Sequence, residues 1–201
     1  GSPGISENCV DSKDHNLYLY AYLKELKTQT ILVEKNYIDH DYLDDFAAYY
    51  VKCHNPYQRE CIRLHFFKKP FTTGDFNELL HGNPEKLTVS NLQDNYNGFL
   101  VIRPLPQKII GRTCLALYPD LGQRHFKTVH DYEANLYGID LSVSTLAFQE
   151  QDEVVSACAT SALWSAFQAT GSLFKQHKLP SPIEVTREAT AHMPLRSRAI
   201  P

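Results

Sequence analysis

The sequence lacks several features that would assign it at once to a functional class. No run approaches the roughly 20 apolar residues that a membrane-spanning helix needs. Lysines and arginines are scattered singly, and the formal charge is −3, so no basic stripe is present for a nucleic-acid backbone. None of the glycines falls in the spacing of a phosphate-binding loop, and no internal repeat or low-complexity segment is visible. We therefore expect neither a nucleic-acid partner nor a membrane partner.

Cysteines are also few. The chain has five, an odd number at wide spacing, and it is too large to depend on disulfides for its stability. Reduced thiols in a cytoplasmic protein are the prediction, and one disulfide with a free thiol left over is the alternative. The five are Cys9, Cys53, Cys61, Cys114 and Cys158.

Hydrophobic residues make up 43% of the 201, enough for the core of one good-sized domain or two small ones. Residues 1–14 are polar and are expected to be disordered, and they begin with Gly1 to Gly4, which is typical of a tag remnant. Patterns of period 3.6 and period 2 then alternate, which predicts an α+β fold with a mixed N-terminal unit of about five strands over 15–145. A second segment is predicted over 146–201. Helices are expected over 15–26, 42–52, 73–80, 154–177 and 182–191, and strands over 28–37, 60–68, 96–103, 109–117, 126–137 and 141–148.

The stretch from Gln151 to Trp164 carries the clearest chemical signal. Cys158 is expected in the first turn of a helix, where the backbone N–H groups and the helix dipole favour a thiolate. A glutamine amide upstream could stabilise a developing oxyanion, and Gln151 and Gln149 are the candidates. The helix is apolar nearly all round, which predicts that it is buried.

These residues resemble the glutamine, cysteine and central helix of papain-like cysteine peptidases. The resemblance covers roughly 146–190. In that family the glutamine stands six residues before the cysteine and an aromatic residue follows the cysteine directly. Here Gln151 stands seven residues before Cys158, and Trp164 lies six residues after it. The resemblance implies a hydrolase that acts on an amide bond of a peptide or protein, with Cys158 and Gln151 as site residues and without a cofactor.

A thiol nucleophile also needs a base, usually a histidine. The resemblance implies a histidine beyond Pro201, because few residues follow Cys158 and the chain ends without the sign of a finished domain. His192 is a second choice, and His125 or His130 would serve if the order of the site residues were permuted.

Two functions of other kinds remain open. Cys158 could simply pack in a non-catalytic binding or regulatory module, because free cysteines are often small buried residues. The same chemistry could also serve acyl transfer. In either case the N-terminal unit could recognise a partner protein.

Three further groups have a functional and a structural interpretation, and the structural one is favoured for each. The cluster of Asp39, Asp41, Asp44 and Asp45 could hold a cation, but acidic residues more readily cap a helix. Arg112 could bind an anion but more readily pairs with a carboxylate. Zinc is disfavoured for Cys53, His54, Cys61 and His65, because Cys61 and His65 would lie about 13 Å apart on one strand.

Overall fold

The computed structural model describes residues 14–83, 85–106, 108–118, 128–150, 158–173 and 179–191, and side-chain detail is absent for 14, 15, 158 and 171–173. In chain order the elements are α2 (Asp14–Glu25), β1 (Thr30–Tyr37), α3 (His40–Ala48), η1 (Tyr50–Lys52), β2 (Cys61–Phe67), α4 (Thr73–Leu80), α5 (Val89–Asp94), β3 (Tyr96–Ile102), β4 (Ile110–Leu115), β5 (His130–Leu136), β6 (Ile139–Thr145), α6 (Cys158–Leu173) and α7 (Pro182–Thr190). Helices and antiparallel sheets are both present, so the predicted α+β class is confirmed.

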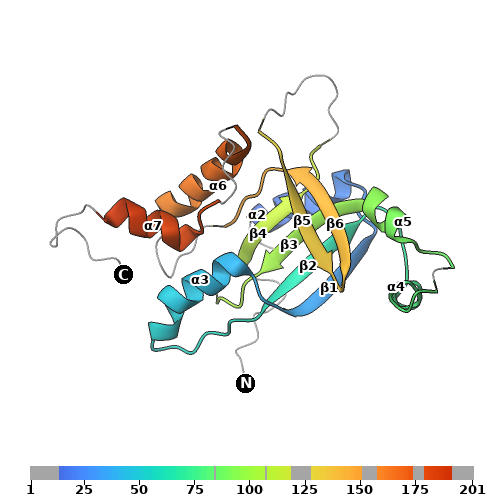
Figure 1. Cartoon of the computed structure of the whole chain (residues 1–201), viewed down its shortest axis with the longest axis horizontal. Coiled ribbons are helices and arrows are strands. Elements are labelled where there is room, and N and C mark those ends of the chain that lie inside the picture. Colours follow the sequence, from blue (N-terminus) through green and yellow to red (C-terminus); the bar gives the residue numbers. More distant parts are fainter. Residues whose placement is uncertain are drawn as a thin grey trace.

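Strands β1 to β4 form one antiparallel sheet in sequential order, and β5 and β6 form a separate hairpin. In Figure 1 the hairpin crosses the sheet on one side, α2 lies on the other, and α6 and α7 stand beside them. The turn between β5 and β6 uses Tyr137 at φ 51° and Gly138 at φ 91°, the left-handed geometry that a tight hairpin requires.

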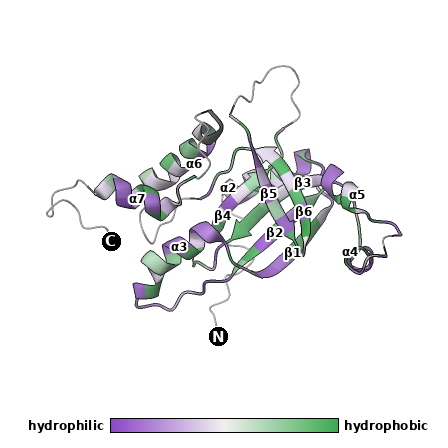
Figure 2. Ribbon diagram, in the orientation of Figure 1, coloured by the Kyte–Doolittle hydropathy of each residue, from purple (hydrophilic) through white to green (hydrophobic). Residues whose placement is uncertain are grey.

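Each face of the sheet has its own apolar cluster, because side chains alternate along a strand. On the α2 side, Leu26 packs with Phe66 and Leu100. On the hairpin side a larger cluster joins β2, β3 and β4 to β5 and β6, and it includes Trp164 of α6. Figure 2 shows hydrophobic residues concentrated along the central strands.

Most predicted elements are present with small shifts of their ends. The alternation predicted around β6 is confirmed, since Leu141, Val143 and Thr145 are buried and Ser142 and Ser144 are exposed. The six-residue helix α5 was not predicted. Part of the strand predicted over 126–137 and the start of the helix predicted from 154 lie outside the described residues.

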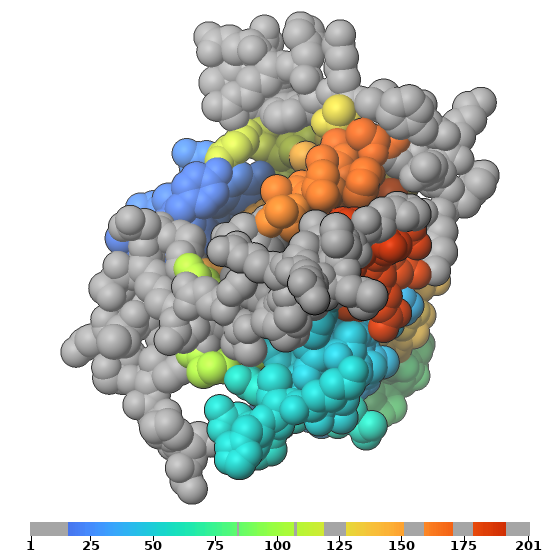
Figure 3. All heavy atoms as spheres, turned by 90° about the vertical axis from the view of Figure 1, so that its left-hand side faces the viewer, coloured from blue at the N-terminus to red at the C-terminus, as the bar shows by residue number. Residues whose placement is uncertain are grey.

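The prediction that the helix after Cys158 is buried all round is wrong. Along α6, Trp164 and Gln168 are buried, but Ala159, Ala162 and Ala166 are exposed, and Leu163 keeps 44% of its surface accessible. Figure 3 shows α6 lying open on one face of the molecule, with α7 beneath it. An apolar composition does not by itself determine which side of a helix is covered, and small alanine side chains need little cover.

Candidate functional site

Helix α6 spans Cys158–Leu173. The first backbone N–H groups of a helix have no partner within it, so a cysteine in the predicted first-turn position would lie in their positive field. Cys158 lies on a helix, as predicted, but residues 151–157 lie outside the described residues, so its place in the first turn and its pairing with Gln151 both stay predictions.

The chain that leads toward Gln151 is held against the edge of the sheet. Phe148 and Thr113 exchange two backbone hydrogen bonds, of 2.8 and 3.1 Å, as an antiparallel bridge. The Glu150 N–H then donates to the carbonyl of Ile110 at 3.0 Å, and the Arg103 guanidinium donates to the Glu150 carbonyl at 3.0 Å. Gln149, the second candidate for the amide, is half-buried in this extended segment.

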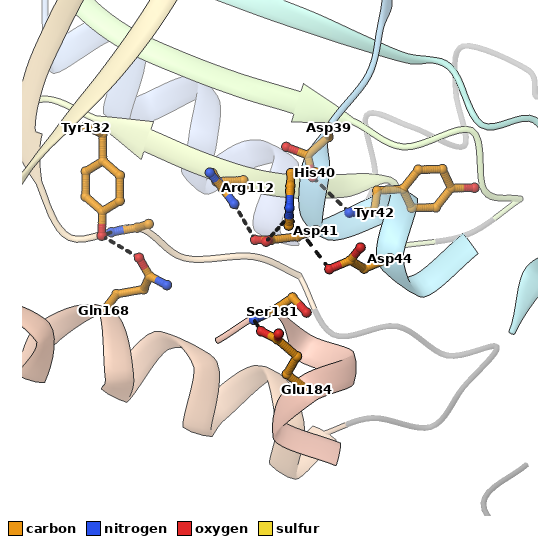
Figure 4. A network of polar contacts seen from close by, with 11 residues as sticks. Asp39, His40, Asp41, Tyr42, Asp44, Arg112, Tyr132, Gln168, Ser181 and Glu184 are labelled. Atoms are coloured by element: carbon orange, nitrogen blue, oxygen red, sulfur yellow. Dashed lines mark hydrogen bonds and ion pairs between the residues drawn. The ribbon is translucent and has the colours of Figure 1, made fainter. Parts of the chain in front are cut away.

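Trp164 anchors α6 to the strands. Its side chain is 1% exposed within the hairpin-side cluster, and the Arg112 guanidinium lies 6.0 Å from its ring. One turn further along, Gln168 accepts a 2.9 Å hydrogen bond from the Tyr132 hydroxyl, which itself accepts one from the Ala147 N–H (Figure 4). Burial raises the pKa of Tyr132 to about 12, so this hydroxyl keeps its proton at neutral pH.

The buried pair of Tyr132 and Gln168 was missed at the sequence level. Neither residue carries a local signal, since they lie 36 positions apart on a strand and a helix. A buried polar side chain needs a partner, but which partner it finds depends on the tertiary structure.

Helix α7 supports the beginning of α6. The Thr160 and Thr186 hydroxyls lie 2.9 Å apart, which joins the first turn of α6 to the middle of α7. Helix α7 also contacts α3. Its start follows the predicted pattern: Pro182 is the first helical residue, and the Ser181 N–H donates to Glu184 at 2.9 Å.

His130 does not lie beside Cys158. Its ring packs edge-on against Tyr132, 5.1 Å away, and the Tyr132 hydroxyl bonds Gln168 near the other end of α6. Gln168 is ten residues beyond Cys158, about 15 Å along a helix. Figure 1 agrees, with the start of β5 near the C-terminal end of α6. His125 and His192 lie outside the described residues, so they remain the candidates for the base within this sequence.

The acidic residues before and within α3 have structural roles. Asp39 is the N-cap and accepts a 3.0 Å hydrogen bond from the Tyr42 N–H. Asp41 pairs with Arg112 at 2.5 Å, while the His40 imidazole faces Asp41 and Asp44 (Figure 4). Burial lowers the pKa of Arg112, but the carboxylates of Asp41 and Asp39 outweigh burial and raise it, so the guanidinium stays charged. Both structural interpretations, the cap and the carboxylate partner for Arg112, are confirmed.

Of the residues considered for zinc, His65 has other partners and Cys61 is buried. His65 is fully buried between Tyr96, whose hydroxyl lies 2.9 Å from Nδ1, and Glu34, whose carboxylate lies 3.3 Å from Nε2. Burial raises the pKa of the Cys61 thiol to about 12, which disfavours the thiolate that a metal would need. Within the described ranges, no three His, Cys, Asp or Glu residues are arranged to hold a metal ion.

Contacts also cross the boundary that was predicted after residue 145, because α6 joins the core cluster through Trp164 and α7 contacts α3.

Among the described residues, no helix is both long enough and apolar enough to span a membrane. Cys53, Cys61 and Cys114 are free thiols. Comparisons with models of protein families, with curated proteins and with solved structures found no match.

Proposed function

We propose that the chain carries the nucleophile of a papain-like cysteine hydrolase that cleaves amide bonds in peptides or proteins. The observation that carries the proposal is that Cys158 belongs to α6 (Cys158–Leu173), a helix that is fixed to the strands through Trp164. A fixed helix holds its dipole and its free N–H groups in one place, which is what thiolate formation at Cys158 requires.

The proposed reaction has two stages. The Cys158 Sγ attacks the carbonyl carbon of the substrate, the carbonyl oxygen becomes an oxyanion, and the amide of Gln151 or Gln149 donates a hydrogen bond to it. A protonated histidine then gives its proton to the departing amine, the C–N bond breaks and a thioester remains. Water, deprotonated by the same histidine, releases the acid and the free thiol. His125 and His192 are the first histidines to test.

The free thiols of Cys53, Cys61 and Cys114 fit a reducing compartment, so we assign the protein to the cytoplasm as part of this proposal. A nucleophilic thiol would also be kept active there. The alternative, a binding module in which Cys158 only packs, is favoured by the structural role of Trp164 on the same helix.

Iodoacetamide labelling read by peptide mass spectrometry separates these two functions. We expect Cys158 to label with an apparent pKa well below the free-thiol value of about 8.5. At pH 6 it should react at least tenfold faster than Cys53, which is exposed and serves as the internal control. Cys61 and Cys114 are buried and should stay unlabelled while the protein is folded.

A Cys158→Ser variant confirms the assignment of the labelled peptide. Equal labelling rates for Cys158 and Cys53 across the pH range would contradict the proposed nucleophile and favour the packing role. An activated thiol would justify a search for substrates with His125→Ala and His192→Ala as companion variants.

A further inference from the structure

One edge of the four-stranded sheet is open among the residues that the structure describes. The β4 edge is partly covered by the bridge between Thr113 and Phe148, whereas β1 pairs only with β2. An edge strand presents unpaired N–H and C=O groups, and proteins usually protect such edges with charges, bulges or proline. Strand β1 has a bulge after Glu34, but its first half, Thr30 to Val33, has no such protection.

A groove of about 420 Å³ runs along this unprotected half. Four consecutive residues, Thr30 to Val33, line it. Because neighbouring side chains point to opposite faces of a strand, the strand edge itself must form this wall. Phe76 and Leu80 of α4 form the facing wall, and Tyr137 of the hairpin turn closes part of it.

The groove collects exposed apolar side chains. Ile31 is 53% exposed, Val33 47%, Leu80 41% and Tyr137 55%. Phe76, which is almost fully buried, also lines the groove. An apolar patch beside an open strand edge matches the physical requirements for binding an extended chain, since the edge supplies main-chain hydrogen bonds and the pockets select alternate side chains.

We propose that this groove binds an extended peptide of a partner protein, which adds a strand between β1 and α4. Alternate apolar side chains of that peptide pack on Phe76 and Leu80. Helix α4 stands beside the open half of β1, so the groove accommodates a single strand more readily than the sheet of a second copy.

Charge complementarity defines the partner further. Lys27, Lys68 and Lys69 are exposed near the beginning of β1, where Thr30 Oγ1 donates to the Lys69 carbonyl at 2.9 Å. Asp75, at the start of α4, is negatively charged and accepts from the Thr72 N–H at 2.8 Å, but the three lysines outnumber it; all four residues lie beside the groove rather than in its lining. The peptide therefore carries its acidic residues at the end that lies near these lysines.

Fluorescence polarisation tests the proposal with two labelled peptide probes. Each contains three Val-Thr repeats, and one carries two aspartates at its N-terminus while the other carries them at its C-terminus. We expect one of the two probes to bind, with an affinity that falls several-fold between 50 and 500 mM salt, roughly as screening of surface charges predicts. A version with two lysines in place of the aspartates should bind at least about tenfold more weakly.

Leu80→Asp should weaken binding at least about tenfold, because it places a charge on the apolar wall. Val89→Asp is the matched control, since Val89 is 47% exposed on α5 outside the groove, and it should change the affinity less than twofold. Circular dichroism checks that both variants fold. Bound peptide should also slow hydrogen exchange of backbone amides in Thr30–Val33.

Three results would overturn the proposal: no binding of either probe at 1 mM, equal affinity for the Leu80→Asp and Val89→Asp variants, or unchanged exchange in Thr30–Val33 at saturation. A dimer that forms without peptide and is lost in Leu80→Asp would assign the groove to a second copy instead. The groove does not depend on the thiol chemistry, so labelling of Cys158 and binding of the probe succeed or fail independently.

Discussion

At the residue scale, the buried His65 and its carboxylate partner Glu34 lead us to expect a fold that is sensitive to acid. Burial lowers the pKa of His65 and outweighs the hydrogen bond to Glu34, which raises it; the Arg63 guanidinium, 2.7 Å from Glu34, acts in the same direction as burial. Burial works to raise the pKa of Glu34, but the hydrogen bonds from His65 and Arg63 outweigh burial and lower it. A neutral His65 can donate from Nε2 to Glu34 and accept at Nδ1 from Tyr96, which satisfies both ring nitrogens.

We predict that the free energy of unfolding falls as the pH decreases from about 6.5 to about 4.5. An unfolded histidine takes up a proton near pH 6.5, whereas His65 in the folded protein resists it, so acid favours the unfolded chain. Below about 4.5 the depressed pKa of Glu34 adds a second loss in the same direction. Urea denaturation at several pH values measures both effects.

His65→Gln should flatten the slope between pH 6.5 and 4.5, because a glutamine amide can donate to Glu34 but does not titrate. His54→Gln is the control, since His54 is exposed. If both variants kept the slope of the parent protein, the acid sensitivity would have to come from residues other than His65.

At the element scale, a glycine leaves room for the backbone of a neighbouring strand. Gly98 in β3 has φ 101°, and a Cβ built there would collide with the carbonyl oxygen of Cys114 in β4. Gly138 in the hairpin turn has a similar φ of 91°, but a Cβ there would meet nothing within 4 Å. The two positions separate the cost of crowding from the cost of backbone strain.

We predict that Gly98→Ala destabilises the protein by about 3 kcal/mol or more, because strands β3 and β4 must separate to admit the methyl group. Gly138→Ala should cost only about 1 kcal/mol, the strain of a left-handed alanine. Chemical denaturation of the two variants measures the difference. Equal losses would show that the strands adjust freely at Gly98.

Sequence patterns predict where most helices and strands lie in this chain, but not which elements pair with one another. Period-2 alternation located β6, because burial of one face imposes it, as Leu141 and Val143 show, whereas β3, which is buried along almost its whole length, was located as an apolar run. The partners of a strand are set by tertiary contacts, so the bridge of Phe148 to Thr113 and the open edge at β1 carried no local signal. Helix α5 was missed because six residues are too few to show a helical period.

The candidate site also has features that the sequence could predict and features that it could not. The helix that contains Cys158 could be predicted, because its composition and its end before Pro180 follow local rules. The capping role of Asp39 followed from the same rules. The side on which α6 is covered could not be predicted, since that depends on where Tyr132 and Arg112 meet it.

At the scale of the whole molecule, Trp164 is the main apolar link between the cysteine helix and the strands. It is fully enclosed in the cluster that also contains Tyr132 and Ala147. Leu163, its neighbour on the same helix, is 44% exposed. Substitution of the two residues therefore compares a buried contact with an exposed one at nearly the same position along α6.

Trp164→Ala should cost about 3 to 5 kcal/mol, the usual loss for a buried tryptophan, whereas Leu163→Ala should cost much less. If α6 is held mainly by this anchor, backbone amides of α6 and α7 should exchange faster in Trp164→Ala, while those of β2 and β3 stay protected. Hydrogen exchange read by mass spectrometry follows both regions in one experiment. Uniform loss of protection in helices and strands would mean instead that the hairpin-side core and α6 unfold as one cooperative unit, and the strands would then depend on the helix as much as the helix depends on them.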